Sequence, residues 1–282
     1  MSTTRNDHIS KDDDLILNLK VVYARAYVRL KGLLREPHWS IAEVTIPLLS
    51  LAAYVYMYTM LDAPAEYMAF VVVGGSMLAF WSNVLWGMSA QLYWEKETGM
   101  LQHYMLSPAS RMAVLLGMAV GGVLNTTLRS ISILLVGTLL FPIEYNLVDV
   151  NALLIVFLLT ITALYGMGML FASLFLLYGR EATHIADLLQ EPIYLFSGIY
   201  YPVLSSQVFS HAVKLVASMI PLTFGIDAIR LLLIMGKGIE DVTLHIVGLS
   251  LLVAILLPLA YIALRRMEET SKRHGRLTLR WQ

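Results

Sequence analysis

Long apolar runs alternate with short polar segments along most of the 282-residue chain. A helix needs about 20 mainly apolar residues to cross the hydrocarbon core of a bilayer. Five runs reach that length and predict membrane-spanning helices at residues 41–61, 68–91, 112–141, 151–178 and 243–264. We refer to them as predicted spans one, two, three, four and six.

Two further apolar stretches are interrupted by polar residues. The stretch 183–203 is a doubtful span five, because its first third contains His184, Asp187, Gln190 and Glu191. The stretch 208–235 is broken by Lys214, Pro221, Asp227 and Arg230. For the second stretch we expect a broken or re-entrant pair of helices at one face of the membrane.

The distribution of basic residues settles whether 183–203 crosses, because Lys and Arg mark cytoplasmic loops. With the N-terminus inside and six crossings, sixteen of the 20 basic residues lie inside, three lie outside, and Arg129 lies within span three. Without a crossing at 183–203, the last span would reverse and place the basic tail outside. The sequence therefore predicts an all-α membrane protein with six transmembrane helices and both termini in the cytoplasm.

The segment 15–36, before the first span, has the pattern of an amphipathic helix. One helix face is defined by apolar residues at intervals of three and four, namely Leu15, Leu19, Val22, Tyr23, Ala26, Tyr27, Leu30, Leu33 and Leu34. Basic residues lie mostly off that face, at Lys20, Arg25, Arg29, Lys31 and Arg35. Such a helix beside a span commonly lies in the membrane interface, although an ordinary surface helix is the alternative. We expect the polar residues 1–14 to be disordered.

The composition agrees with a membrane protein and excludes several kinds of site. Hydrophobic residues make up 58% of the chain and charged residues only 14%, whereas soluble domains contain about 25% charged residues. The absence of cysteine excludes disulfides and thiolate metal sites. The zero net charge provides no overall field that would attract nucleic acid. A cleavable signal peptide is not expected, because the chain begins with polar residues of both charges.

Polar and aromatic residues inside the predicted spans are candidates for a functional site. Polar groups in the membrane are costly and usually face a cavity or a partner. The candidates within the spans are Phe80, Asn83, Asn125, Arg129 and Tyr165. The alternatives are a structural partner or snorkelling for Arg129, and lipid or core packing for the aromatic residues.

A second polar group lies at the start of 183–203. His184, Asp187 and Glu191 follow the spacing of one helix face and could hold a metal ion or a proton. Such a group is more often a solvated helix start, so we predict no metal site.

The connection between spans two and three, residues 94–111, is the most informative segment. Glu95 and Glu97 stand at its start, where a carboxylate complements the positive end of a helix dipole. Ser107-Pro108 ends the short helix before span three begins. A short helix in a cytoplasmic loop is suited to pushing against a soluble partner, and a plain connector is the alternative.

This loop resembles the cytoplasmic loop of permease subunits in type-2 ABC exporters. The matching positions are Glu95, Glu97, Gly99, Leu101, Leu106, Ser107, Pro108 and Arg111. A later block resembles the span-five motif of the family at Pro192, Leu195, Phe196, Ser197, Gly198, Tyr201 and Pro202. The segment before the last span resembles its counterpart at Pro221, Leu222, Thr223, Phe224, Gly225, Asp227, Ala228 and Arg230. The chain departs from the family at Met100, where a small Thr is usual, and at Ser206-Gln207, where a proline is frequent.

The resemblance implies a division of labour between subunits. Two permease chains, identical or sister, would pair, and two ABC nucleotide-binding ATPase subunits would dock below them. The five candidates within the spans would line the translocation pathway or the contact between the permease chains. The segment 15–36 would be the connecting helix, 37–267 the permease domain and 268–282 a basic cytoplasmic tail. The loop would carry the coupling helix, with ATPase-coupling residues Glu95, Lys96, Glu97, Thr98, Gly99, Met100, Leu101, Tyr104, Met105, Ser107 and Pro108.

The chain contains no GxxxxGK[ST] phosphate loop. We therefore expect it to be no enzyme by itself and to bind no cofactor, with ATP-Mg held by the partner ATPase. The resulting prediction is an exporter of drug- or lipid-like substrates in a prokaryotic inner (plasma) membrane. The alternatives are an ion-coupled secondary transporter, which tends to show repeats and intramembrane carboxylates, and a membrane enzyme.

Overall fold

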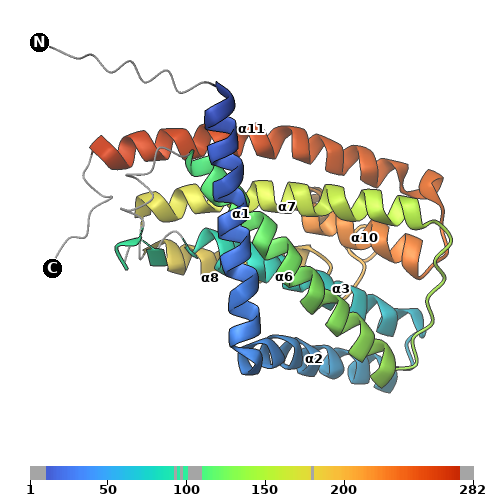
Figure 1. The fold of residues 1–282 in the computed structure, drawn as a ribbon. Helices are drawn as coiled ribbons and strands as arrows, with labels where there is room; N and C mark the ends of the chain where they lie inside the picture. The colour runs from blue at the N-terminus through green and yellow to red at the C-terminus, as the bar shows by residue number, and fades with distance from the viewer. Residues whose placement is uncertain (1–10, 92–93, 96–97, 101–109, 179–180, 274–282) are drawn as a thin grey trace, which may run out of the picture.

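The structure is a computed structural model that describes residues 11–91, 94–95, 98–100, 110–178 and 181–273. Every regular element within these residues is helical, with labels as in Figure 1. The elements are α1 (Lys11–Arg35), α2 (Pro37–Met60), α3 (Glu66–Ser82), the π-helix η1 (Asn83–Ser89), α6 (Arg111–Leu140), α7 (Val150–Tyr178), α8 (Glu181–Phe196), α9 (His211–Ser218), α10 (Pro221–Leu233), the short 3-10 helix η2 (Ile239–Val242) and α11 (Thr243–Arg273).

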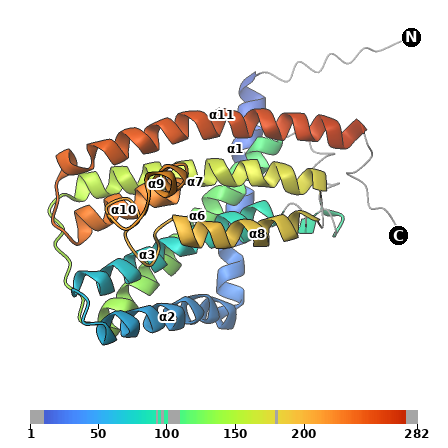
Figure 2. The ribbon, with the colours of Figure 1, turned by 180° about the vertical axis from the view of Figure 1, so that it is seen from behind.

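The five clear spans predicted from hydropathy are confirmed. Within the described residues, five helical segments are long and apolar enough to cross a membrane: Ser40–Met60, Glu66–Ser89, Met112–Leu140, Val150–Phe175 and Ile239–Arg266. Both ribbon views show them as one elongated bundle, with α6 inclined across the others (Figures 1 and 2). The Glu66–Ser89 span is central. Of the residues in its apolar 18-residue stretch, 83% are buried, against 11% in the corresponding stretch of Ser40–Met60.

The helix ends divide into two groups. The ends of η1, α7 and α11 and the starts of α6 and α8 lie at one end of the bundle, whereas the connections α2–α3 and α6–α7 lie at the other (Figures 1 and 2). These groups match the two sides assigned from the basic residues. We call the first group the inner end, following that prediction, and the other the outer end.

The helix predicted at 183–203 is shorter than expected. Helix α8 has 16 residues and ends at Phe196, a length of about 24 Å, which falls short of the hydrocarbon core of about 30 Å. The Ser197 amide closes the last turn on the Ile193 carbonyl, and Gly198 then adopts a φ of +70°, a left-handed conformation that ends helices.

The chain nevertheless continues toward the outer end after α8. The Tyr58 hydroxyl, near the outer end of α2, donates a 3.1 Å hydrogen bond to the Tyr200 carbonyl. The ring of Tyr200 also stacks on Tyr54, with 3.9 Å between centroids. The region 183–203 thus combines a short helix with a continuation of turns and bends.

The broken helical pair expected at 208–235 is confirmed. Helices α9 and α10 meet at an angle of 99°, and Pro221 occupies the first turn of α10, where a missing amide hydrogen costs nothing. The last residue of α10, Leu233, accepts a 2.8 Å hydrogen bond from the Asn146 amide in the outer α6–α7 connection. The pair is therefore a broken or re-entrant element that finishes at the outer end.

A buried arginine fixes this re-entrant element to the bundle. Arg230 in α10 is only 3% exposed. Its guanidinium donates to the backbone carbonyls of Gly198, Ile199 and Phe70 at 2.6, 2.7 and 2.8 Å. Arg230 therefore holds together α10, the turn after α8 and the start of α3.

Helix α1 runs across the bundle and packs mainly on α6 (Figure 1). The Ser110 amide donates a 2.7 Å hydrogen bond to the Asn18 side chain, and a Cβ at Gly121 would lie 2.9 Å from the Ala26 Cα. Residues Lys11–Asp14, within the segment 1–14 expected to be disordered, already belong to the helix.

The two faces of α1 have opposite surroundings. Of the predicted apolar face, Leu15, Leu19 and Tyr23 are exposed, whereas Arg25 and Arg29 turn toward the bundle. The exposed apolar face suits contact with lipid. Placement of α1 in the membrane interface stays a prediction.

Candidate functional site

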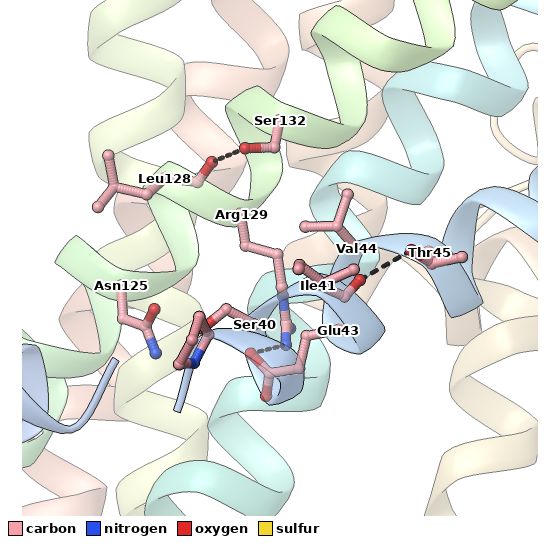
Figure 3. A pocket seen from close by; sticks show the side chains of 10 residues that line it. Ser40, Ile41, Glu43, Val44, Thr45, Asn125, Leu128, Arg129 and Ser132 are labelled. Carbon is pink, nitrogen blue, oxygen red and sulfur yellow. Dashed lines mark hydrogen bonds and ion pairs between the residues drawn. The ribbon is translucent and has the colours of Figure 1, made fainter. Parts of the chain in front are cut away.

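Two charged side chains from different helices pair within the spans. The Arg129 guanidinium in α6 lies 3.3 Å from a carboxylate oxygen of Glu43 in α2, and Figure 3 shows the two side chains meeting between the helices. Arg129 also donates a 2.7 Å hydrogen bond to the Ala79 carbonyl in α3. Because a lone charge in hydrocarbon is expensive, this arrangement stabilises both ions and joins three helices.

The Glu43–Arg129 pair forms a wall between two pockets. The first, which we call the α2–α6 pocket, has a volume of about 520 Å³ and is also lined by Ser40, Ile41, Val44, Asn125 and Leu128 (Figure 3). The second, which we call the α2–α8 groove, has a volume of about 360 Å³ and is also lined by Pro47, Gly75, Tyr194 and Tyr200. Movement of either charged side chain would therefore alter both spaces.

Glu43 was not among the residues that we singled out from the sequence. The signal was available, because Glu43 is the one acidic residue of predicted span one and Arg129 the one basic residue of predicted span three. Opposite charges buried in two spans are expected to pair. A further polar contact joins α10 and α11, where the His245 ring lies 3.0 Å from the Asp227 carboxylate.

The candidate pathway residues occupy two different environments. Asn125 and Arg129 line the α2–α6 pocket. Phe80, Asn83 and Tyr165 are instead buried in the interior, where the Tyr165 hydroxyl donates a 2.9 Å hydrogen bond to Asn83. The structure thus brings Asn125 together with Arg129, and Asn83 together with Tyr165. A role of any of the five in a pathway stays a prediction.

The π-helix η1 makes polar contacts on both of its sides. The Gly87 carbonyl accepts a 2.5 Å hydrogen bond from Arg29 of α1, and the Trp86 indole donates at 2.9 Å to the Gln190 side chain of α8. A π-helical turn is wider than an α-helical one and is frequent at functional sites. Here it links the connecting-helix candidate α1 to α8 through the central span.

Only part of the predicted coupling segment lies within the described residues. Lys96, Glu97, Leu101, Tyr104, Met105, Ser107 and Pro108 lie outside them. Of the others, Thr98 and Met100 are exposed, whereas Glu95 is only 5% exposed and forms an ion pair with Arg25 of α1. The Glu95 side chain therefore contacts α1 of its own chain. An ATPase-coupling role of the segment stays a prediction.

The polar group on α8 faces outward. His184, Asp187 and Glu191 are all exposed, which fits the solvated helix start considered from the sequence.

A family model for the membrane domain of ABC-2 type transporters matches residues 21–234, from α1 to the end of α10. The chain belongs to this family. The match covers more than half of the chain and includes all three resembling segments noted in the sequence. A search of curated proteins found no match.

The family assignment fixes the general role of this permease. ABC-2 domains are the membrane components of ABC transporters, and they are not themselves the ATPases. The assignment implies an ABC ATPase as partner and a membrane as the environment, in agreement with the five helical segments that, in the part of the chain the structure describes, are long enough to span one. It does not favour the ion-coupled alternative.

Proposed function

We propose that this permease forms the translocation pathway of an ABC exporter for hydrophobic or amphipathic, drug- or lipid-like substrates. ATP hydrolysis on a separate nucleotide-binding subunit drives the transport, and a second permease chain, identical or sister, completes the pathway. The observation that carries this proposal is the ABC-2 match over residues 21–234. The absence of a phosphate loop from the sequence supports a separate ATPase.

The contact between Arg25 and Glu95 provides a route by which a movement of the ATPase reaches the membrane helices. Glu95 lies in the connection between η1 and α6, and Arg25 lies in the middle of α1. A push from the ATPase on this connection is passed to α1 through their buried ion pair. Because α1 also contacts η1 through Arg29, the same movement reaches the central span.

The α2–α8 groove is the best candidate for a stretch of pathway. It extends from the Glu43–Arg129 pair, near the inner end of α2, toward Tyr200, near its outer end. Most of its wall is apolar, and the tyrosines add polar tips to an aromatic surface, which suits an amphipathic substrate. The exposed face of α2 leaves room for a second permease chain to close the groove.

The coupling proposal is tested with charge exchange in the reconstituted complex of permease and ABC ATPase. We expect Arg25→Glu and Glu95→Arg each to reduce ATP-driven transport about tenfold, within the usual range of coupling free energies. The double exchange should restore most of the activity. Lys237→Glu serves as the control, because Lys237 is a half-exposed residue of the outer α10–α11 connection.

Two results would contradict the proposal. The first is a permease that neither co-purifies with an ABC ATPase nor changes its rate of ATP hydrolysis. The second is a set of charge variants that assemble normally and transport as fast as the Lys237→Glu control.

A further inference from the structure

The α2–α6 pocket lies near the inner membrane boundary and opens between two helices. The candidate span of α2 begins at Ser40, so Glu43 lies only about 5 Å along the helix from that point. Beside the ion pair, the pocket has an apolar wall made by Ile41, Val44 and Leu128. A polar centre next to an apolar wall at this depth matches the geometry of an amphiphile whose head group lies at the membrane surface.

The charges of the pocket restrict which head group fits. Glu43 and Arg129 are both largely buried, with side chains 29% and 13% exposed. An amphiphile with one charge would replace one partner of the pair and leave the other charge unpaired, which is strongly unfavourable in a buried site. A head group with a cation and an anion can replace both partners at once and leave no charge unpaired.

Further hydrogen-bonding capacity is present beside the pair. The described residues offer the Asn125 amide no hydrogen-bond partner, and Figure 3 shows this side chain on the same side of α6 as Arg129. By contrast, the hydroxyls of Thr45 and Ser132 are bound to the Ile41 and Leu128 carbonyls of their own helices. Asn125 is therefore available to a bound head group.

We propose that the α2–α6 pocket binds the head group of a zwitterionic amphiphile from the inner leaflet. The ammonium group takes the place of Arg129 on Glu43, the anionic group takes the place of Glu43 on Arg129, and an acyl chain lies along Ile41, Val44 and Leu128. Separation of Glu43 from Arg129 opens the wall between this pocket and the α2–α8 groove. The role of the pocket as an entry site for substrate rests on the proposed export function; the binding itself does not.

Native mass spectrometry of the purified full-length permease, without ATPase or ATP, tests the binding. The probes are three lipids with identical acyl chains: phosphatidylethanolamine, which is zwitterionic, phosphatidylglycerol, which is anionic, and diacylglycerol, which is uncharged. We expect the wild type to retain phosphatidylethanolamine best. Glu43→Gln should weaken the binding of phosphatidylethanolamine about tenfold, because the variant loses one charge-assisted hydrogen bond to the ammonium group. It should also shift the preference to phosphatidylglycerol, because Arg129 then has no carboxylate partner.

Further variants separate the site from a general effect on folding. Arg129→Gln should lose the preference for both phospholipids over diacylglycerol. The exchange Glu43→Arg with Arg129→Glu should keep the preference for phosphatidylethanolamine, because a zwitterion can bind in the reversed direction. Glu240→Gln, at an exposed outer position, should behave as the wild type.

Equal retention of the three lipids by the wild type would mean annular lipid only and would overturn the proposal. A wild-type preference that survives in Glu43→Gln and Arg129→Gln would also overturn it. Both results are independent of the ATPase, so failure of this inference is distinguishable from failure of the export function.

Discussion

Replacement of Arg230 by methionine should destabilise the outer half of the bundle. The substitution removes three hydrogen bonds of 2.6–2.8 Å to the carbonyls of Gly198, Ile199 and Phe70. A hydrogen bond from a charged donor contributes about 1.5 kcal/mol or more. The methionine side chain recovers part of this loss by burying an apolar stem of similar length. We expect a net loss of about 3 kcal/mol, because burial of the free carbonyls remains uncompensated.

The assay is thermal unfolding of the detergent-solubilised permease, followed by intrinsic tryptophan fluorescence. A loss of this size should lower the midpoint by roughly 5–10 °C in a chain of this length. Arg230→Lys should give an intermediate shift, because a single ammonium group cannot reach all three carbonyls. Arg266→Met, at an exposed site on α11, is the control. If Arg230→Met and Arg266→Met unfold at the same temperature, the carbonyl anchor has been misinterpreted.

Two other predictions concern packing and the interior polar pair. Gly74→Ala should give a misfolded or poorly expressed permease, because its Cβ would lie 1.8 Å from the Ile199 carbonyl oxygen. In Gly32→Ala the new Cβ meets nothing within 4 Å, so this variant should stabilise α1 by up to about 1 kcal/mol. Equal yields and melting temperatures of the two variants would refute this reasoning. Tyr165→Phe removes the 2.9 Å hydrogen bond to Asn83. The variant should lose about 1 kcal/mol of folding stability and keep the wild-type transport rate. A variant of unchanged stability that transports several times more slowly would instead place Tyr165 in the pathway.

The five clear spans could be predicted because membrane crossing imposes a length and a composition that a local stretch of sequence reveals directly. The broken pair was also predictable, since Pro221 and the charges around it mark the interruption. By contrast, the end of α8 depends on a tertiary contact. Arg230, far along the chain, donates hydrogen bonds to the carbonyls of Gly198 and Ile199, which the turn after α8 leaves without helical partners, and no local pattern reveals that donor.

The candidate site was only half predictable for a related reason. Arg129 stood out as a lone charge in a span, but its partner required knowledge of how α2 and α6 cross. Asn83 and Tyr165 look equally suited to a pathway in the sequence, yet helix packing places both in the interior. On α1, periodicity identified the apolar face but did not reveal that this face is exposed. The basic face turns toward the bundle instead, because Arg25 and Arg29 bind Glu95 and the Gly87 carbonyl there.

The central claim is that this permease transports its substrate only when a separate ABC ATPase hydrolyses ATP. The most direct measurement is transport into proteoliposomes that contain the permease and its ATPase, with a fluorescent amphiphile as cargo and the ATPase-facing side outward. We expect accumulation that requires ATP and disappears when the phosphate-loop lysine of the ATPase is replaced. Accumulation of the same size without ATP, or with the inactive ATPase, would contradict the claim.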